Sequence, residues 1–355
     1  MQVALTGIPG TGVKTIFSAI TGNVEEAGAS SWNPGQSRLV SLRVPDERLD
    51  IITEVYKPKK KTYATVELVE FPGLFGSPST DNAAIGKIRQ TDAIVIVLRT
   101  FESQAFPHPS GSIDPARDLE RIYSDFVIAD LEVLETRHER LEKNLARMKK
   151  DEDVAEFEVL CKCRELLNSG KGVSEAGLSE DESKLIRSFG FLTEKPLVLL
   201  INVGESQLGD EESAMSAFVE KGYEAQALCG SLEAELCALD EEERAEFMSD
   251  FGVTELAAPA VLSAIFRRLS ILTFFTYGED ECRAWNVEEG DTAVDAAGKV
   301  HTDLARGFIR AEVVAWDDFK EHGSVKDVKA AGKFRLEGKE YLVNEGDLII
   351  IRHNA

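Results

Sequence analysis

Four short runs of apolar residues stand out in the first two thirds of the chain. They cover residues 3–6, 66–71, 93–98 and 197–203, and the last two consist almost entirely of Val, Ile and Leu. Such runs are typical of central parallel strands whose two faces are covered by helices. Helical patterns lie between the runs. The sequence therefore predicts an α/β fold with a doubly wound, mostly parallel sheet.

Between residues 114 and 192 the pattern changes to helix. Apolar positions recur in steps of four and three, as in the seam of a coiled coil, at Val127, Leu131, Leu134, His138, Leu141, Leu145 and Met148. A weaker apolar stripe returns after a charged segment at 149–153. We therefore expect an antiparallel helical hairpin at 114–192, inserted into an α/β domain made of residues 1–113 and 193–270.

From residue 271 onward, short strand patterns surround a single helix. The expected strands are 271–276, 281–287, 340–343 and 348–351, and the expected helix is 293–300. Strands around a helix in so few residues predict a compact, ubiquitin-like β-grasp domain over residues 271–355.

Composition narrows the classes of partner. The 355 residues carry a net charge of -23, which argues against a general polyanion binder. A basic cluster at Lys57, Lys59, Lys60 and Lys61 is nevertheless a candidate contact for RNA phosphates. No apolar run reaches the length of a membrane span, and the five cysteines are scattered. We expect a cytoplasmic monomer without a secretory signal, a membrane segment or a metal site.

A glycine-rich turn joins the first predicted strand to the first predicted helix, which is the setting of a phosphate-binding loop. Its glycines let backbone N–H groups and the helix N-terminus converge on an anion. The usual pattern is G-x-x-x-x-G-K-[ST], but here Val13 stands at the lysine position and Lys14 at the hydroxyl position. The candidate phosphate-binding residues are Gly7, Ile8, Pro9, Gly10, Thr11, Gly12, Val13, Lys14 and Thr15.

Several strings resemble the YchF-type (Obg-like) P-loop ATPases/GTPases. They include Pro45-Asp46-Glu47-Arg48-Leu49-Asp50, Phe71-Pro72-Gly73-Leu74, Asn202-Val203-Gly204-Glu205 and, in the last domain, Arg283-Ala284-Trp285 and Arg306-Gly307-Phe308-Ile309-Arg310-Ala311-Glu312. The resemblance implies a G domain, a helical insertion and a C-terminal TGS domain. It also implies binding and slow hydrolysis of ATP or GTP, and association with ribosomes and RNA.

By the same resemblance, Asn202, Val203 and Glu205 border the nucleotide base, where most GTPases carry Asn-Lys-x-Asp. The family's change is associated with relaxed specificity or a preference for ATP, because adenine lacks the two donors that the aspartate accepts. Gly230 and Ser231 occupy the second loop on the base side. The alternative for Asn202 is a helix cap after a strand.

The positions that should neutralise a triphosphate depart from the family pattern. The family's Asp-x-x-Gly switch reads Glu70-Phe71-Pro72-Gly73 here, with Glu70 in place of the Asp and Gly73 kept, and Pro34 lies near the expected switch threonine. Because phosphoryl transfer depends on these charges, we expect weak or lost hydrolysis, no catalytic residue and a nucleotide that needs no Mg²⁺. We also predict a salt bridge between Lys14 and Glu70. The alternative is a solvent-exposed Lys14.

The preferred hypothesis is a nucleotide-binding protein of the translation apparatus that acts through protein or RNA contacts. A second candidate RNA surface comprises Arg306, Arg310 and Lys339. One alternative is an active ATPase/GTPase whose rearranged loop gives Lys14 the lysine role. Another is a nucleotide-free interaction scaffold.

Overall fold

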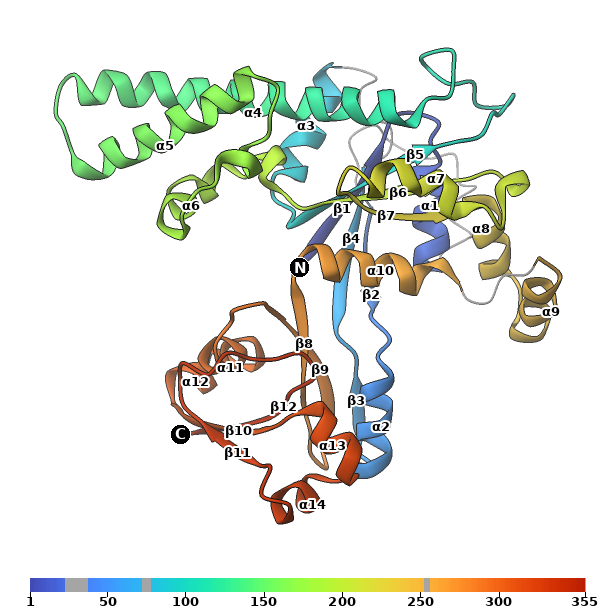
Figure 1. The fold of residues 1–355 in the computed structure, drawn as a ribbon, viewed down its shortest axis with the longest axis vertical. Coiled ribbons are helices and arrows are strands. Elements are labelled where there is room, and N and C mark those ends of the chain that lie inside the picture. The colour runs from blue at the N-terminus through green and yellow to red at the C-terminus, as the bar shows by residue number, and fades with distance from the viewer. Residues whose placement is uncertain (23–37, 72–77, 252–255, 355) are drawn as a thin grey trace. The chain divides into compact units, whose positions relative to one another are not determined.

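The structure is a computed structural model that describes residues 1–22, 38–71, 78–251 and 256–354 (Figure 1). The chain forms two compact units, residues 1–40 with 67–261 and residues 41–66 with 262–355. The sequence prediction assigned residues 41–66 to the first domain, whereas they belong to the second unit. In the described part of the chain, no helix is long and apolar enough to cross a membrane.

The first unit is organised around a six-stranded sheet in the order β2-β4-β1-β5-β6-β7. Strand β1 pairs in parallel with β4 and β5, and β6 and β7 continue the parallel arrangement. The strands are β1 (Gln2–Gly7), β2 (Arg38–Arg43), β4 (Thr65–Phe71), β5 (Ala93–Arg99), β6 (Leu197–Asn202) and β7 (Glu224–Leu228). The four strands expected from apolar runs are confirmed as β1, β4, β5 and β6.

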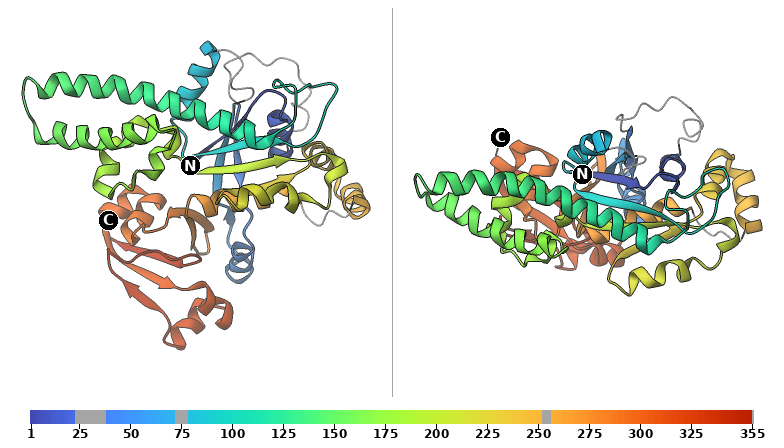
Figure 2. Two further views of the ribbon diagram at one scale, coloured as in Figure 1. Left: turned by 45° about the horizontal axis from the view of Figure 1, so that its top comes forward. Right: turned by 90° about the horizontal axis from the view of Figure 1, so that it is seen from above.

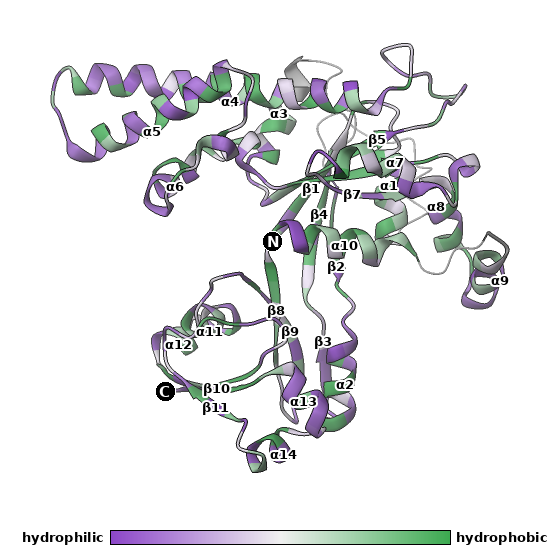
Figure 3. Ribbon diagram, viewed as in Figure 1, coloured by the Kyte–Doolittle hydropathy of each residue, from purple (hydrophilic) through white to green (hydrophobic). Residues whose placement is uncertain are grey.

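Helices cover this sheet, which explains why every residue of β5 and β6 is buried. These strands are coloured as hydrophobic in Figure 3. Outside the helical insertion, the helices are α1 (Val13–Thr21), α3 (Pro78–Ile88), α7 (Glu211–Val219), α8 (Gly230–Ala238), α9 (Glu241–Phe251) and α10 (Ala257–Arg268).

The inserted segment contains the two long helices α4 (Pro115–Leu145) and α5 (Asp151–Asn168), which run side by side in opposite directions (Figure 2), followed by α6 (Glu180–Ile186). Their shared core includes Leu134, Leu141 and Leu160. His138 is buried on the same seam, as its position in the repeat predicts. Met148 lies beyond the end of α4 and is 61% exposed, so the predicted seam is one position too long.

The second unit holds a mixed six-stranded sheet in the order β11-β10-β12-β8-β9-β3. Its strands are β3 (Lys60–Thr62), β8 (Ile271–Thr276), β9 (Glu281–Glu288), β10 (Phe308–Val314), β11 (Arg335–Glu337) and β12 (Leu348–His353). Its helices are α2 (Glu47–Tyr56), α11 (Ala293–Val300), α12 (Thr302–Arg306), α13 (Trp316–His322) and α14 (Val325–Ala330). Helix α11 contributes Ala293, Ala296 and Ala297 to the same core as Phe274 of β8. Strands packed on α11 agree with the predicted β-grasp, but the details differ. Residues 340–343 form only an isolated bridge at Leu342, strands β10 and β11 were not expected, and α12, α13 and α14 follow the single helix that was.

Candidate functional site

The glycine-rich loop leaves β1 at Gly7 and enters α1 at Val13. Gly10 and Gly12 have φ values of 87° and 93°, which side-chain-bearing residues rarely adopt. Thr11 is buried and folds back, so that its backbone N–H and its hydroxyl both donate to the carbonyl of Ile8, at 3.3 and 2.9 Å. The loop therefore has a defined shape that depends on its glycines.

Asn202, the last residue of β6, fastens this loop from the other side. Its Nδ2 donates to the carbonyl of Thr11 at 2.8 Å, and its Oδ1 accepts from the backbone N–H of Gly230 at 3.0 Å. Gly12 lies directly against it, since a Cβ atom added there would be 2.3 Å from Nδ2. The Asn202 amide thus ties two loops together. The second bond satisfies the N–H of the first residue of α8, and contact of Asn202 with a nucleotide base stays a prediction.

The residues expected on the base side lie close to one another. Glu205 is exposed at the start of a 3₁₀ turn (η5, Glu205–Gln207), and Ser231 is exposed in the first turn of α8. The Ser231 hydroxyl donates to a carboxylate oxygen of Glu205 at 3.5 Å. Val203 is buried, and its N–H donates to the carbonyl of Leu228. Glu205 and Ser231 therefore offer polar groups to solvent on this side.

Val13 occupies the position of the phosphate-binding lysine but points into the protein. Its side chain is 5% exposed, and its Cγ2 lies 3.2 Å from where a Cβ of Gly7 would stand. Lys14 and Thr15 follow in the first turn of α1, and both are partly buried. Val13 therefore contributes packing and no charge to the loop.

Glu70 is 1% exposed near the end of β4, beside Leu5 of β1. One carboxylate oxygen, Oε2, accepts a hydrogen bond from Nε of Arg38, the first residue of β2. Among the described residues, none donates to the other oxygen, Oε1. The predicted Lys14–Glu70 salt bridge is therefore wrong, because Arg38 supplies the cation. The second switch residue, Gly73, and the segment around Pro34 lie outside the described residues.

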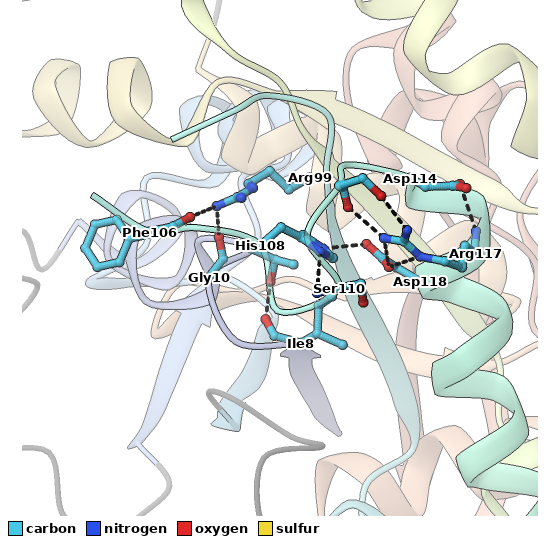
Figure 4. Close-up of polar contacts among 11 residues, drawn as sticks. Ile8, Gly10, Arg99, Phe106, His108, Ser110, Asp114, Arg117 and Asp118 are labelled. Atoms are coloured by element: carbon cyan, nitrogen blue, oxygen red, sulfur yellow. Dashed lines mark hydrogen bonds and ion pairs between the residues drawn. The ribbon is translucent and has the colours of Figure 1, made fainter. Parts of the chain in front are cut away.

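Arg99, at the end of β5, is a site residue that the sequence analysis missed. Its Nη1 donates to the carbonyls of Gly10 and Phe106, at 2.7 and 3.0 Å (Figure 4). The side chain is 1% exposed, and burial lowers the pKa of its guanidinium, while the carboxylates of Glu102 and Asp118 oppose that shift. The sequence does carry one signal for this residue, because Arg99 is the only charged residue in the apolar strand 93–99.

The segment after β5 carries a second buried group. His108 Nδ1 accepts from the backbone N–H of Ser110 at 3.2 Å, so the ring proton of the neutral histidine lies on Nε2. That nitrogen is 2.8 Å from Oδ2 of Asp118, whose Oδ1 is 2.9 Å from Nη2 of Arg117 (Figure 4). The arrangement fixes the tautomer and orientation of His108. Arg99 connects this segment to the glycine-rich loop through Phe106.

The basic cluster is largely neutralised within the second unit. Lys59 pairs with Asp280 at 2.7 Å and Lys60 with Glu281 at 3.0 Å, and Lys61 pairs with Asp50. The first two pairs accompany the pairing of β3 with β9. These lysines therefore stabilise a sheet edge, and their contact with RNA stays a prediction. Of the other expected basic residues, Arg306 lies 3.9 Å from Asp303.

Comparison with known proteins gives matches over the whole chain. Residues 271–354 match the family model YchF-GTPase_C, described as a protein of unknown function (DUF933). The chain is 36% identical to the ribosome-binding ATPase YchF of Bacillus subtilis (strain 168), with 100% of both chains covered. It is 34% identical to Obg-like ATPase 1 of Homo sapiens, covering 100% of this chain and 93% of that protein.

The solved structures include a similar fold. The structure of the Schizosaccharomyces pombe YchF GTPase superposes with a TM-score of 0.84 at 28% sequence identity, and covers 99% of this chain and 97% of that one. The similarity therefore extends through both units and the helical insertion.

Proposed function

Because the chain belongs to the family of YchF and Obg-like ATPases, we propose that it binds a purine nucleotide, ATP or GTP, at the glycine-rich loop. The phosphates lie over residues 7–15 and the base lies beside Asn202, Val203 and Glu205, with Gly230 and Ser231 on its other side. The relatives that support this nucleotide are named as ATPases.

The observation that carries the proposal is the way the loop is held. Asn202 and Arg99 hold the carbonyls of Thr11 and Gly10 with buried side chains from two different strands. These carbonyls point toward protein donors, and α1 begins directly after Gly12. A helix N-terminus preceded by a rigid glycine loop favours a phosphate group. These supports hold the loop backbone in the shape that a phosphate site requires.

We propose further that hydrolysis is weak or lost. Cleavage of a triphosphate needs cationic groups and a metal where charge accumulates. Val13 is buried against the end of β1, and the carboxylate of Glu70 is engaged by Arg38. The alternative in which Lys14 takes over the lysine role requires the loop to shift by one residue, which would break the close packing of Gly12 against Asn202.

The third part of the proposal is association with the ribosome. Its support is the name of the bacterial relative, a ribosome-binding ATPase that matches this chain end to end. Because the chain carries a net charge of -23, it would be repelled by rRNA over a broad area, so we expect it to contact ribosomal proteins, or to contact rRNA through a local basic surface of its own. Arg310 and Lys339, both exposed in the second unit, are candidates for that surface.

Calorimetric titration of ATP, GTP and ADP into the full chain, followed by a phosphate-release assay, tests the first two parts. We expect saturable binding of at least one nucleotide without measurable turnover. Turnover that depends on Mg²⁺ and disappears in Lys14→Ala would instead support the active enzyme with a rearranged loop. Absence of binding to all three nucleotides would support the scaffold.

Co-sedimentation with ribosomes tests the third part. We expect the wild-type chain to pellet with ribosomes, and the double variant Arg310→Glu/Lys339→Glu to remain in the supernatant. Lys59→Glu/Lys60→Glu is the matched control, because these lysines are already paired with acidic residues. Equal pelleting of all three proteins would remove Arg310 and Lys339 from the interface, and absence of pelleting would reject the association.

A further inference from the structure

Among the described residues, those at the two usual magnesium positions of a P-loop ATPase do not fit the ion. In such enzymes a P-loop Ser or Thr hydroxyl and a nearby acidic residue hold the ion beside the phosphates. Mg²⁺ requires oxygen ligands in octahedral geometry at about 2.0–2.1 Å. Here an ammonium-bearing side chain, Lys14, stands at the hydroxyl position. The corresponding carboxylate, Glu70, already has a cationic partner.

That partner is held from two sides. The guanidinium of Arg38 bonds to Oε2 of Glu70 and also lies over the ring of Phe17, with Cζ 4.7 Å from the ring centroid. Phe17 is 1% exposed and lies one turn after Val13 on α1. A cation over an aromatic face is attracted by the ring electrons. Arg38 is therefore fixed between the first helix and the acidic strand end.

The location of the pair matters as much as its contacts. Glu70 is 1% exposed and pairs in register with Leu5, two residues before the glycine loop begins. Arg38 is partly buried, with 25% of its side chain exposed. Arginine stays protonated under all physiological conditions. A divalent ion approaching Glu70 would meet this fixed positive charge and would have to break a largely buried ion pair.

We propose that the Arg38–Glu70 pair takes the place of the metal, so that this protein binds its nucleotide in the metal-free form. The inference rests on the proposed nucleotide site and adds the form of the ligand. Arg38 cancels the charge of Glu70, which would otherwise repel a phosphate that carries no metal. Arg38 is thus a specificity-determining residue that excludes Mg²⁺ without touching the base.

The direct test is calorimetric titration of ADP into the full-length protein, once in EDTA and once in excess MgCl₂. We expect ADP to bind at least as tightly in EDTA as in MgCl₂, because Mg²⁺ sequesters the metal-free ADP that this site accepts. A Kd that weakens by about tenfold or more in EDTA would overturn the inference while leaving the proposed function intact. Absence of ADP, ATP and GTP binding in both buffers would reject the proposed function, and the inference with it.

A pair of variants tests whether Arg38 is responsible. The triple variant Lys14→Ser/Arg38→Gln/Glu70→Asp supplies a hydroxyl and an unpaired carboxylate, and we expect ADP to bind about tenfold more tightly with Mg²⁺ than in EDTA. The matched double variant Lys14→Ser/Glu70→Asp keeps Arg38, and it should bind ADP no more tightly with Mg²⁺ than in EDTA. If the double variant also gains magnesium dependence, Arg38 is not the excluding group.

Electron paramagnetic resonance with Mn²⁺ keeps the proposal testable if a variant fails to fold. Wild-type protein saturated with ADP is titrated with MnCl₂, an ion that substitutes for Mg²⁺. We expect only the spectra of free Mn²⁺ and of Mn²⁺–ADP in solution. A broadened signal from Mn²⁺ immobilised on the protein with ADP would contradict the proposal.

Discussion

The backbone side of the candidate nucleotide site and its charged side differ in what holds them in place. The backbone side is the loop 7–12, fastened by Asn202 and Arg99 through short hydrogen bonds to its carbonyls. On the charged side the usual P-loop groups are replaced: Val13 stands at the lysine position and is buried, and the Glu70 carboxylate pairs with Arg38. The loop therefore keeps a well-supported backbone where the charged positions beside it depart from the P-loop pattern.

The difference has a physical origin. A loop whose glycines have positive φ and whose carbonyls bond to buried side chains tolerates little change, because each alteration leaves a buried polar group without a partner. Charged side chains at the rim can be exchanged so long as each buried charge keeps an opposite charge beside it. We therefore expect substitutions that disturb the loop backbone to lower stability and nucleotide affinity strongly, and substitution of Lys14 to change nucleotide affinity little.

The largest effect is expected for Gly12→Ala. The new Cβ would lie 2.3 Å from Asn202 Nδ2 at a φ of 93°, so we expect a loss of roughly 3 kcal/mol in unfolding free energy and about 100-fold in nucleotide affinity. Gly22→Ala is the control, because its φ is also positive but nothing lies within 4 Å. It should cost about 1 kcal/mol with unchanged binding. Equal losses in the two variants would contradict the proposed role of the Gly12–Asn202 contact.

Asn202→Ala should be nearly as severe. It removes the partners of the Thr11 carbonyl and the Gly230 N–H, and leaving both unpaired costs about 2–3 kcal/mol. Chemical denaturation measures this loss, and Asn168→Ala, at the exposed end of α5, should change stability by less than about 0.5 kcal/mol. If Asn202→Ala were equally mild, the amide would not be what fastens the loop.

Arg99→Met tests the second fastening. The Met side chain fills the space but frees the carbonyls of Gly10 and Phe106, so we expect about 2 kcal/mol of destabilisation. Hydrogen exchange at residues 8–12 and 103–108 should accelerate in both segments together. Arg121→Met, on the exposed face of α4, is the control. Faster exchange in only one segment would show that Arg99 does not couple them.

The smallest effect is expected for Lys14→Ala. If Lys14 does not contact the phosphates, removing this one partly exposed charge should change nucleotide affinity by less than about threefold. Calorimetric titration of ATP measures the change. A loss of about 100-fold would mean that Lys14 does the work of the missing P-loop lysine.

Much of the fold could be predicted from periodicity alone. The central strands of the first sheet are continuous apolar runs, and the hairpin has a clear heptad seam, so both follow from local pattern. The edge strands β2, β3 and β7 were missed because they are short or only partly buried. The membership of residues 41–66 in the second unit could not be predicted, because it depends on Leu49 and Ile52 packing beside Phe275.

For the site, the glycine pattern located the loop but could not identify its supports. Arg99 and Asn202 act through hydrogen bonds to carbonyls about 90 and 190 positions away in sequence, and nothing local marks those bonds. A salt bridge to Glu70 was predicted, but with the wrong cationic partner. Lys14 was closer to Glu70 by motif position, whereas the sheet order brings β2, and with it Arg38, next to β4.

The most direct test of the rebuilt charges is steady-state phosphate release from saturating ATP in excess Mg²⁺, with Gly12→Ala as the background. We predict a wild-type rate that cannot be distinguished from that of Gly12→Ala, because the groups that neutralise a breaking triphosphate have been exchanged. Magnesium-driven release by the wild-type protein that disappears in Gly12→Ala would contradict this.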